Sequence, residues 1–189
     1  YGLVGSEMCI RDSLEHIESQ CEWLERLVQT LLKLITLERE IERRPCEVDA
    51  LFDTVRQNTQ KSLADRGVTL ITHSGGGTLN CNADLIQSLL INLVDNAAKA
   101  YDTDAPDKRV FLNFSADTIE VRDFGRGIPE EAMGRIFEPF YMADKSRSKK
   151  AGGSGLGLAL VKRIANAHDA ELTVKSGVGK GTTVRVRFQ

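Results

Sequence analysis

Apolar residues recur at alternating three- and four-residue intervals through the N-terminal part of the chain. This heptad spacing predicts one long helix over residues 14–44, ending before Pro45. Further leucines widen the apolar stripe, which favours a helix of a four-helix bundle over a two-stranded coiled coil or a core helix of a globular domain. Such a helix needs a partner helix or a second copy of the chain. The heptad positions are Leu14, Ile17, Cys21, Leu24, Val28, Leu31 and Ile35. Self-association is expected through Leu24, Leu27, Val28 and Leu31.

Residues 1–13 break the heptad spacing and contain two glycines. No matching apolar pattern accompanies them, so we interpret this segment as non-native or disordered and leave it out of the fold prediction.

Beyond Pro45, helix-like and strand-like segments follow one another. Helical spacing covers residues 49–65, 82–100, 130–136 and 156–167, and strand-like runs cover 68–72, 78–81, 109–114, 118–122, 171–174 and 182–188. Several strands follow each other without a helix between them, which excludes a purely parallel sheet. The prediction for residues 45–189 is an α+β fold, a two-layer α/β sandwich whose mixed sheet is covered on one face by helices.

Composition narrows the possible functions without identifying one. The 189 residues include 25 basic and 27 acidic side chains, and a net charge of −2 gives no field for holding nucleic acid. No apolar run is long enough to cross a membrane, so we expect a cytoplasmic domain that a longer parent chain could carry on a membrane anchor. The four cysteines form no C-x-x-C pair, and we interpret them as reduced thiols rather than zinc ligands.

Two asparagines and a lysine lie beside the apolar stripe of the helix predicted at 82–100. Asn92, Asn96 and Lys99 are four and three residues apart, so they share one side of that helix. Asparagine is a poor residue inside a helix, and two at one-turn spacing indicate a ligand role. A carboxamide oxygen suits Mg²⁺, which shares phosphate oxygens with few protein groups. A solvated polar face is the alternative that this stripe alone leaves open.

Two glycine-rich segments have the composition of ligand-binding turns. Asp123-Phe124-Gly125-Arg126-Gly127 follows a predicted strand, and its carboxylate can accept a hydrogen bond from an amine such as that of adenine, although ordinary turns also use Asp and Gly. Residues 152–158 open a predicted helix, where exposed amides suit phosphate. The basic run before them is either a solvated loop or a cationic lid; it contains Lys145, Arg147, Lys149 and Lys150.

In their order along the chain, five segments closely resemble the sequence boxes of sensor histidine kinases of two-component systems. The N box corresponds to residues 92–99, the first glycine box to 123–129, the F box to 136–141, the second glycine box to 153–158 and the last glycine box to 179–182. The resemblance implies that residues 45–189 are the catalytic ATP-binding domain with the Bergerat fold. It implies that residues 14–44 are the second helix of an incomplete dimerisation and histidine-phosphotransfer hairpin.

The resemblance also implies a role for individual residues at the phosphate end of a bound ATP. Asn96, helped by Asn92, would bind Mg²⁺, and Lys99 would reach the phosphates. The glycines that would cap the phosphates are Gly153, Gly155 and Gly157. Lys145 and Arg147 would belong to a mobile lid over residues 142–153.

At the adenine end, the resemblance implies that Asp123 holds the amine, that Thr182 lies nearby, and that Gly125 and Gly127 admit the ring. Phe137 and Phe140 would anchor the lid by packing on the core. The remaining residues of the expected ATP-binding set are Ile128, Tyr141, Leu156 and Leu158.

The chain has no phosphoacceptor of the family's pattern, because none of its three histidines is followed by an acid and Arg-Thr-Pro. We interpret His16 as a surface or interface residue of the first helix. The expected function is transfer of the ATP γ-phosphate to a histidine outside this chain, without self-phosphorylation. The expected partners are the parent protein's own dimerisation and phosphotransfer domain, a response regulator and a second copy in a homodimer, and no nucleic acid.

Two other functions share the same pocket. ATP hydrolases of the superfamily place a glutamate base four residues before the metal-binding asparagine, where this chain has Asn92. Serine kinases of the anti-sigma type lack a long helix in front of the catalytic domain. Both therefore fit the sequence less well than a histidine kinase does.

Overall fold

The computed structural model describes residues 14, 17, 20, 21, 24, 25, 27–37, 41–143 and 154–189. The chain divides into two compact units, Tyr1–Thr36 and Leu37–Gln189. In the first unit, residues 27–36 are helical, and so are the described positions before them. The predicted N-terminal helix is confirmed at these positions, whereas the prediction for residues 1–13 lies outside the described residues. Its stripe stays exposed at Leu14, Ile17, Leu24, Val28 and Ile35.

The first helix ends before the point that the sequence pattern indicated. Residue 37 and residues 41–43 are not helical, and the strand β1 (Arg44–Glu47) follows them. β1 pairs antiparallel with β3 (Thr78–Cys81), with Arg44 opposite Cys81. The prediction of a helix through residue 44 is therefore wrong at its C-terminal end, because the backbone there takes its hydrogen bonds from a strand distant in sequence.

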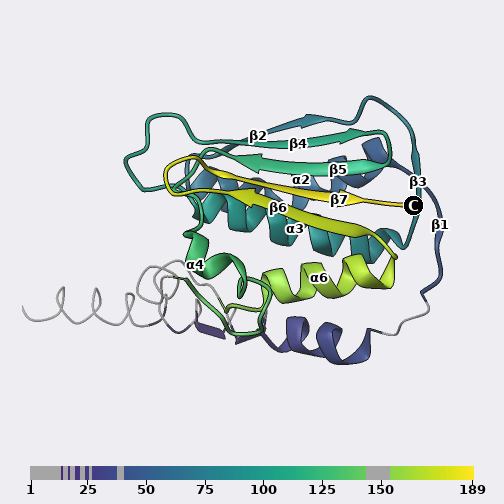
Figure 1. Cartoon of the computed structure of the whole chain (residues 1–189), viewed down its shortest axis with the longest axis horizontal. Helices are drawn as coiled ribbons and strands as arrows, with labels where there is room; N and C mark the ends of the chain where they lie inside the picture. Colours follow the sequence, from purple (N-terminus) through teal and green to yellow (C-terminus); the bar gives the residue numbers. More distant parts are fainter. Residues whose placement is uncertain are drawn as a thin grey trace, which may run out of the picture. The chain divides into compact units, whose positions relative to one another are not determined.

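A five-stranded mixed sheet forms one layer of the second unit, in the order β2-β4-β5-β7-β6 (Figure 1). β2 (Thr69–His73) runs parallel to β4 (Arg109–Ser115). β5 (Thr118–Asp123), β7 (Thr182–Arg187) and β6 (Glu171–Ser176) continue the sheet through antiparallel pairs. Every second residue of β4 is buried and the residues between are more exposed, as expected for a sheet with one covered face.

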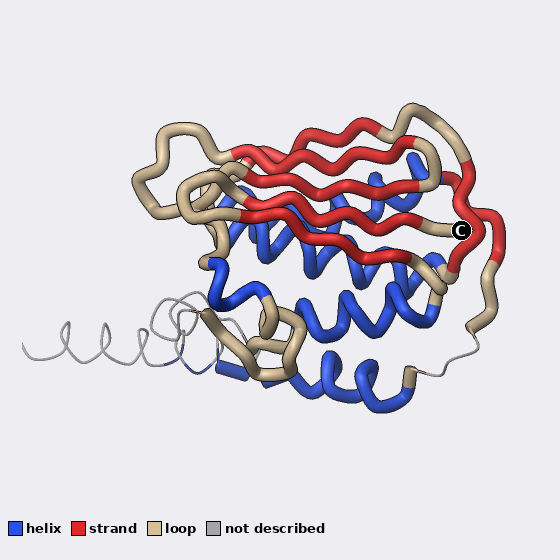
Figure 2. The backbone as a smooth tube through the Cα atoms, viewed as in Figure 1, coloured by secondary structure: helices blue, strands red, loops and turns tan. Residues whose placement is uncertain are grey.

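Helices cover one face of this sheet (Figure 2). They are α2 (Val48–Asp65), α3 (Ala83–Lys99) and α6 (Gly157–Ala167), and a single-turn helix, α4 (Glu130–Met133), precedes α6. α3 is the central helix, because it contacts α2, α6 and the strands β4 and β5. The predicted two-layer α+β sandwich is confirmed. In the described part of the chain, no helix combines the length and apolar character needed to cross a membrane.

A buried histidine joins the end of α6 to the start of α3. His168 is 2% exposed, its Nε2 accepts a hydrogen bond from the backbone N–H of Asn82 at 3.1 Å, and its Nδ1 lies 2.8 Å from the carbonyl oxygen of Ile164. Because one ring nitrogen accepts and the other donates, the ring is neutral. Burial lowers the pKa of His168, and the charge of Arg43 adds to this effect.

The neutral ring of His168 should make stability depend on pH. Its contribution is complete above the unfolded-state pKa of about 6.5 and is lost as pH falls through the lower pKa of the folded state. Replacing His168 by Gln removes this titration, so the stability gap between wild type and His168→Gln should narrow as pH falls from 7.5 to 5.5. Urea unfolding at several pH values measures this difference in unfolding free energy. Groups that titrate equally in the two proteins do not contribute to the difference. A gap that stays constant over this range would contradict the assignment of a neutral ring.

Candidate functional site

A buried carboxylate ends β5 and organises one end of the site. Asp123 is 5% exposed, and its Oδ1 accepts hydrogen bonds from the backbone N–H groups of Gly125 at 2.9 Å and Thr182 at 3.2 Å. Its second oxygen, Oδ2, has no hydrogen bond to any residue that the structure describes. No buried polar side-chain atom of the described residues is left without a partner, so Oδ2 keeps access to solvent.

The pKa of Asp123 is shifted by two opposing effects. Burial raises the pKa to about 6, while the hydrogen bonds from Gly125 and Thr182 act in the lowering direction. Near neutral pH the carboxylate is therefore mostly ionised, with one oxygen held by the backbone and the other available to a hydrogen-bond donor.

Glycines let three backbone segments approach each other closely around Asp123. A Cβ at Gly181, where φ is +73°, would lie 2.2 Å from the carbonyl oxygen of Asp123. A Cβ at Gly127 would lie 1.9 Å from the carbonyl oxygen of Gly177, and one at Gly125 would lie 2.6 Å from that of Ala100. At Gly125 and Gly127, backbone atoms of other turns occupy the space that a Cβ would need. At both positions the absence of a side chain therefore lets the turns pack closely against each other.

Ser176 connects these turns, although no local sequence pattern predicts this role. Its hydroxyl donates to the carbonyl oxygen of Gly181 at 2.9 Å and accepts from the backbone N–H of Ile128 at 2.8 Å. Because its single hydrogen is used, the 2.9 Å contact with the hydroxyl of Thr182 has Thr182 as the donor. One side chain therefore holds β6, the turn after β5 and the start of β7 together.

The C-terminal end of α3 is attached to the same turn. The hydroxyl of Tyr101 donates to the carbonyl oxygen of Arg109 and accepts from the backbone N–H of Phe124 at 2.9 Å. The backbone N–H of Arg126 donates to the carbonyl oxygen of Ala100 at 3.0 Å. Tyr101 was not among the predicted site residues, because nothing in its local sequence indicates a contact with a turn more than twenty positions later.

At the other end of the site, two side chains of α3 meet the start of α6. Asn92 donates from Nδ2 to the carbonyl oxygen of Ser88 at 2.7 Å, and its Oδ1 lies 2.8 Å from the position that a Cβ of Gly157 would take. The Nδ2 of Asn96 lies 3.6 Å from that position. Among the described residues, no side chain caps the N-terminus of α6. The structure thus brings together two predicted carboxamides and an uncapped helix N-terminus, which suits an anion and its metal ion.

These carboxamides also decide whether a hard cation fits. Within the described ranges, no three His, Cys, Asp or Glu side chains gather as a metal site. Asn96 makes no hydrogen bond to a residue in those ranges, and Asn92 uses only its amide nitrogen, so both oxygens are uncommitted. Amide oxygens at one-turn spacing are a donor set that Mg²⁺ accepts when phosphates and water complete its octahedron.

Lys99 is not turned toward this end in the structure. Its Nζ pairs with Asp95 Oδ2 at 2.6 Å, and Asp95 also accepts from the hydroxyl of Ser62 at 3.3 Å. Lys99 would have to leave this ion pair to reach a phosphate.

The segment before residue 144 is fixed by its backbone. Phe140 has a φ of +63°, and its backbone N–H donates to the carbonyl oxygen of Gly155 at 2.9 Å. A Cβ at Gly155 would lie 2.8 Å from Phe140 backbone atoms. The side chain of Phe140 is 57% exposed, so the prediction that it packs on the core is wrong. The reason is that the left-handed backbone conformation directs the anchor contact through the main chain.

The remaining predicted residues divide into core and surface. Leu156 is completely buried and belongs to the core, whereas Leu158 is partly buried. The Cζ of Arg135 lies over the ring of Tyr141, 4.5 Å from the ring centroid. The Nζ of Lys162 lies 5.6 Å from the centroid of the Phe137 ring. Lys145, Arg147 and Gly153, together with most of the predicted lid, lie outside the described residues.

Two glycines of one loop should respond differently to alanine. Gly179 and Gly181 have nearly the same φ, +72° and +73°, but a Cβ at Gly179 would meet nothing within 4 Å. Gly179→Ala should cost about 1 kcal/mol of backbone strain, whereas Gly181→Ala should cost roughly 2 kcal/mol more, because the added carbon displaces Asp123. Urea unfolding compares the two variants. Equal losses would mean that the approach of Gly181 to Asp123 is not required by the fold.

The buried charge of Asp123 should reduce stability at neutral pH. A raised pKa means that the folded state holds the proton more tightly than the unfolded chain, so stability falls as pH rises from about 4 to about 7. Asp123→Asn removes this cost, and relative to wild type the variant should gain up to about 3 kcal/mol on going from pH 4.5 to pH 7.5. Urea unfolding at the two pH values gives the difference, and carbon-13 NMR gives the wild-type pKa directly. A relative stability of the variant that does not change with pH would refute the raised pKa.

Comparison with known proteins places these features in a family. The family described as histidine kinase-, DNA gyrase B- and HSP90-like ATPase matches residues 81–189. Sensor histidine kinase YkoH of Bacillus subtilis is 34% identical over 181 residues, which cover 95% of this chain and 39% of YkoH. Sensor protein SrrB of Staphylococcus aureus is 28% identical over 193 residues, covering 99% of this chain and 33% of SrrB. The chain therefore spans well under half the length of these relatives.

Solved structures agree on the fold. A structure of full-length ShkA in complex with AMPPNP superposes with a TM-score of 0.72 at 22% identity, covering 93% of this chain and 38% of ShkA. The family match covers more than half of the chain and includes α3, the turn after β5 and the start of α6. The chain therefore belongs to the histidine kinase-, DNA gyrase B- and HSP90-like ATPase family and contains the ATP-binding catalytic domain of a sensor histidine kinase.

Proposed function

We propose that this domain binds ATP with Mg²⁺ and transfers the γ-phosphate to a histidine on the dimerisation and phosphotransfer hairpin of its parent protein. The observation that carries the proposal is the pairing of two unlike ends along α3. A buried carboxylate with one oxygen available lies at one end, and at the other two carboxamides, whose oxygens bond no described residue, lie at the N-terminus of α6.

The two ends have the chemistry of the two ends of ATP. The exocyclic amine of adenine donates to Oδ2 of Asp123, while Oδ1 stays bound to the backbone of Gly125 and Thr182. The phosphates lie at the start of α6, where the free N–H groups and the positive end of the helix dipole stabilise negative charge. Between Asn92 and Ala100, α3 rises by about 12 Å, which leaves room for an extended nucleotide along the helix.

Asn96 and Asn92 hold the metal ion through their amide oxygens. The bound Mg²⁺ supplies charge neutralisation on the phosphates, which in phosphoryl transfer is most of what catalysis requires besides positioning. Lys99 exchanges its ion pair with Asp95 for a phosphate oxygen when nucleotide binds, since both acceptors are anionic and lie within reach of one flexible side chain. Lys145, Arg147 and Gly153 complete the phosphate contacts as part of the lid.

Transfer to an external histidine is favoured over hydrolysis. A carboxamide cannot take a proton from water, and Asn92 occupies the position at which hydrolases of this superfamily carry a glutamate. The nearby carboxylate of Asp95 is engaged by Lys99 and Ser62. The acceptor histidine comes from the parent protein's hairpin. The first helix of this chain is the second helix of that hairpin, and it ends near residue 36.

The partners follow from this role. The exposed stripe on the first helix packs against the rest of the hairpin and against a second copy of the chain, because single helices do not bury such a stripe alone. A response regulator receives the phosphate from the histidine. The domain acts in the cytoplasm, on a parent protein that other segments anchor to the membrane.

Asn96→Ala should lower ATP affinity at least tenfold in the presence of Mg²⁺ and have much less effect when the ion is chelated. Asn58→Ala is the control for removing an asparagine from a helix, because Asn58 is exposed on α2 and not on α3, and its Nδ2 bonds the carbonyl oxygen of Thr54 at 2.8 Å as that of Asn92 bonds the carbonyl oxygen of Ser88. Titration calorimetry measures both variants with and without chelator. An Asn96→Ala variant with wild-type affinity would overturn the metal assignment.

The same pair of variants tests the transfer step. Incubated with γ-labelled ATP, the chain alone should stay unlabelled, and a separately supplied hairpin domain with its histidine should acquire acid-labile label. Asn96→Ala should abolish that labelling and Asn58→Ala should leave it unchanged. Acid-labile label on the chain itself, lost on replacing His16, would make His16 the phosphoacceptor and contradict the proposal.

A further inference from the structure

Two thiols meet at the small sheet formed by β1 and β3, away from the nucleotide site. In this antiparallel pair, Cys46 stands opposite Leu79 and Cys81 opposite Arg44, so the two cysteines are diagonal neighbours on the same face. The Sγ of Cys46 lies 3.3 Å from the carbonyl oxygen of Arg44 and 3.7 Å from that of Cys81, so the single thiol hydrogen has two backbone acceptors. Burial raises the pKa of Cys81 to about 12, and the neighbouring Cys46 side chain acts in the same direction.

The two cysteines differ in their access to solvent. Cys46 is partly exposed, whereas Cys81 is 1% exposed. A small oxidant in solution therefore reaches Cys46 before Cys81. Cys21, which is exposed, belongs to the other unit of the chain.

We propose that Cys46 and Cys81 form a redox-active pair that closes to an intramolecular disulfide when the protein meets a hydroperoxide. The register of β1 and β3 places the two cysteines on one face, and the Sγ of Cys46 contacts the backbone of Cys81.

The reaction takes two steps. The Cys46 thiol gives up its proton and the thiolate attacks a peroxide oxygen; the O–O bond breaks, Cys46 becomes a sulfenic acid, and the departing hydroxide or alkoxide takes that proton and leaves as water or an alcohol. Cys81 gives up its proton and attacks the Cys46 sulfur, so that the S–S bond forms, the S–O bond breaks and the departing hydroxide takes that proton as water. Two electrons pass from the two sulfurs to the peroxide. The high pKa of Cys81 makes the second step the slow one.

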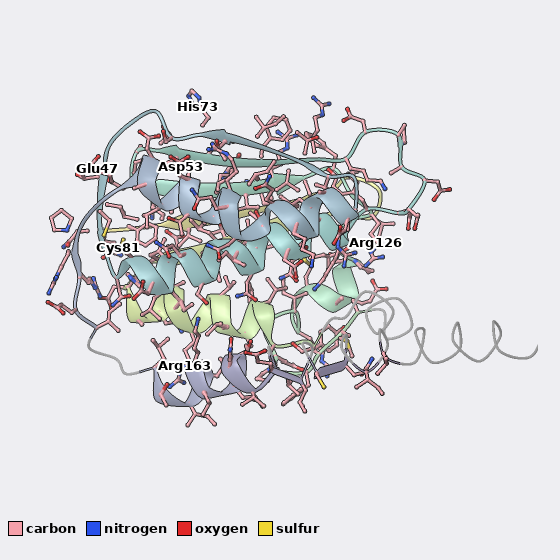
Figure 3. The ribbon with its side chains drawn as sticks, turned by 180° about the vertical axis from the view of Figure 1, so that it is seen from behind. Glu47, Asp53, His73, Cys81, Arg126 and Arg163 are labelled. Carbon is pink, nitrogen blue, oxygen red and sulfur yellow. The ribbon has the colours of Figure 1, made fainter. Side chains whose placement is uncertain are left out.

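The disulfide would fasten the segment that enters the catalytic domain. Residues 42 and 43 are already held by hydrogen bonds, from Asn82 Nδ2 to the carbonyl oxygen of Glu42 at 3.2 Å and from Arg43 to the carbonyl oxygen of Ala167 at 3.0 Å. Cys81 directly precedes Asn82, the N-cap of α3. Figure 3 shows Cys81 and Arg126 at opposite ends of the domain. Oxidation therefore acts on the entry of the chain into the domain and not on the nucleotide site.

The test uses the full chain with Cys9 and Cys21 replaced by Ser, so that only the proposed pair remains. After treatment with hydrogen peroxide and blocking of free thiols, trypsin should release residues 44–56 joined to residues 67–99 and lighter by two hydrogen atoms. Cys46→Ser and Cys81→Ser, each in the same background, should give no joined peptides. Dithiothreitol should separate the two peptides.

A thermal measurement gives a second readout. The cysteines are 35 positions apart, and closing a loop of that size should raise the Tm of the oxidised protein by roughly 5–10 °C, reversibly with dithiothreitol. Cys46→Ser, whose replaced side chain is partly exposed, should fold normally and show no shift, which keeps the test valid if Cys81→Ser is unstable. Oxidation of Cys46 to sulfinic acid without joined peptides, or joining only between two molecules, would overturn the proposal.

Discussion

The burial of the Asp123 carboxylate is the constraint on which the geometry of the site depends. A carboxylate in the protein interior is costly unless hydrogen-bond donors surround it, and here the donors are two backbone N–H groups. One of them belongs to Thr182, nearly sixty positions later in the chain, so β7 has to begin beside the end of β5. That approach is possible only because residue 181 has no side chain. The requirement of one charge thus fixes the relative position of two turns.

The two ends of the site are prepared to different degrees. Around Asp123 the hydroxyls of Ser176 and Tyr101 and several backbone groups are paired with one another. On the part of α3 that faces the phosphate end, Asn96 makes no hydrogen bond to another described residue, and Lys99 is paired with Asp95. In the proposed complex, an adenine ring would meet a rigid acceptor, whereas a triphosphate would meet groups that rearrange around it. This difference suits a kinase, because the phosphate end has to admit a second reactant after the nucleotide is bound.

The helix α3 links this site to a second rigid region at its N-terminus. There the neutral ring of His168 accepts from Asn82, and the segment before β1 is attached to the ends of α3 and α6 through Glu42 and Arg43. The thiols of Cys46 and Cys81 lie in the same region. A covalent bond there would stiffen the connection through which the first helix and the catalytic domain are joined, without touching groups that contact nucleotide.

The sequence by itself determined the layers of the fold and the order of the site segments. Alternation in β4 and the apolar stripe of α3 reflect burial on one face, which is a local and periodic property, and the strands and helices after Pro45 were placed within a few residues of their observed ends. The spacing of Asn92 and Asn96 likewise follows from helical geometry alone.

Only the tertiary structure decided which distant groups meet. The helix before Pro45 ends early because residues 44–47 form a strand that pairs with β3. No local sequence pattern predicts this pairing, because the two strands are more than thirty positions apart. Ser176 and Tyr101 act through hydrogen bonds to turns remote in sequence, so their types carry no signal. Phe140 looked apolar enough for the core but is held by its backbone against Gly155. Periodicity reports which side of an element is buried, whereas long-range backbone approach depends on the packed chain as a whole.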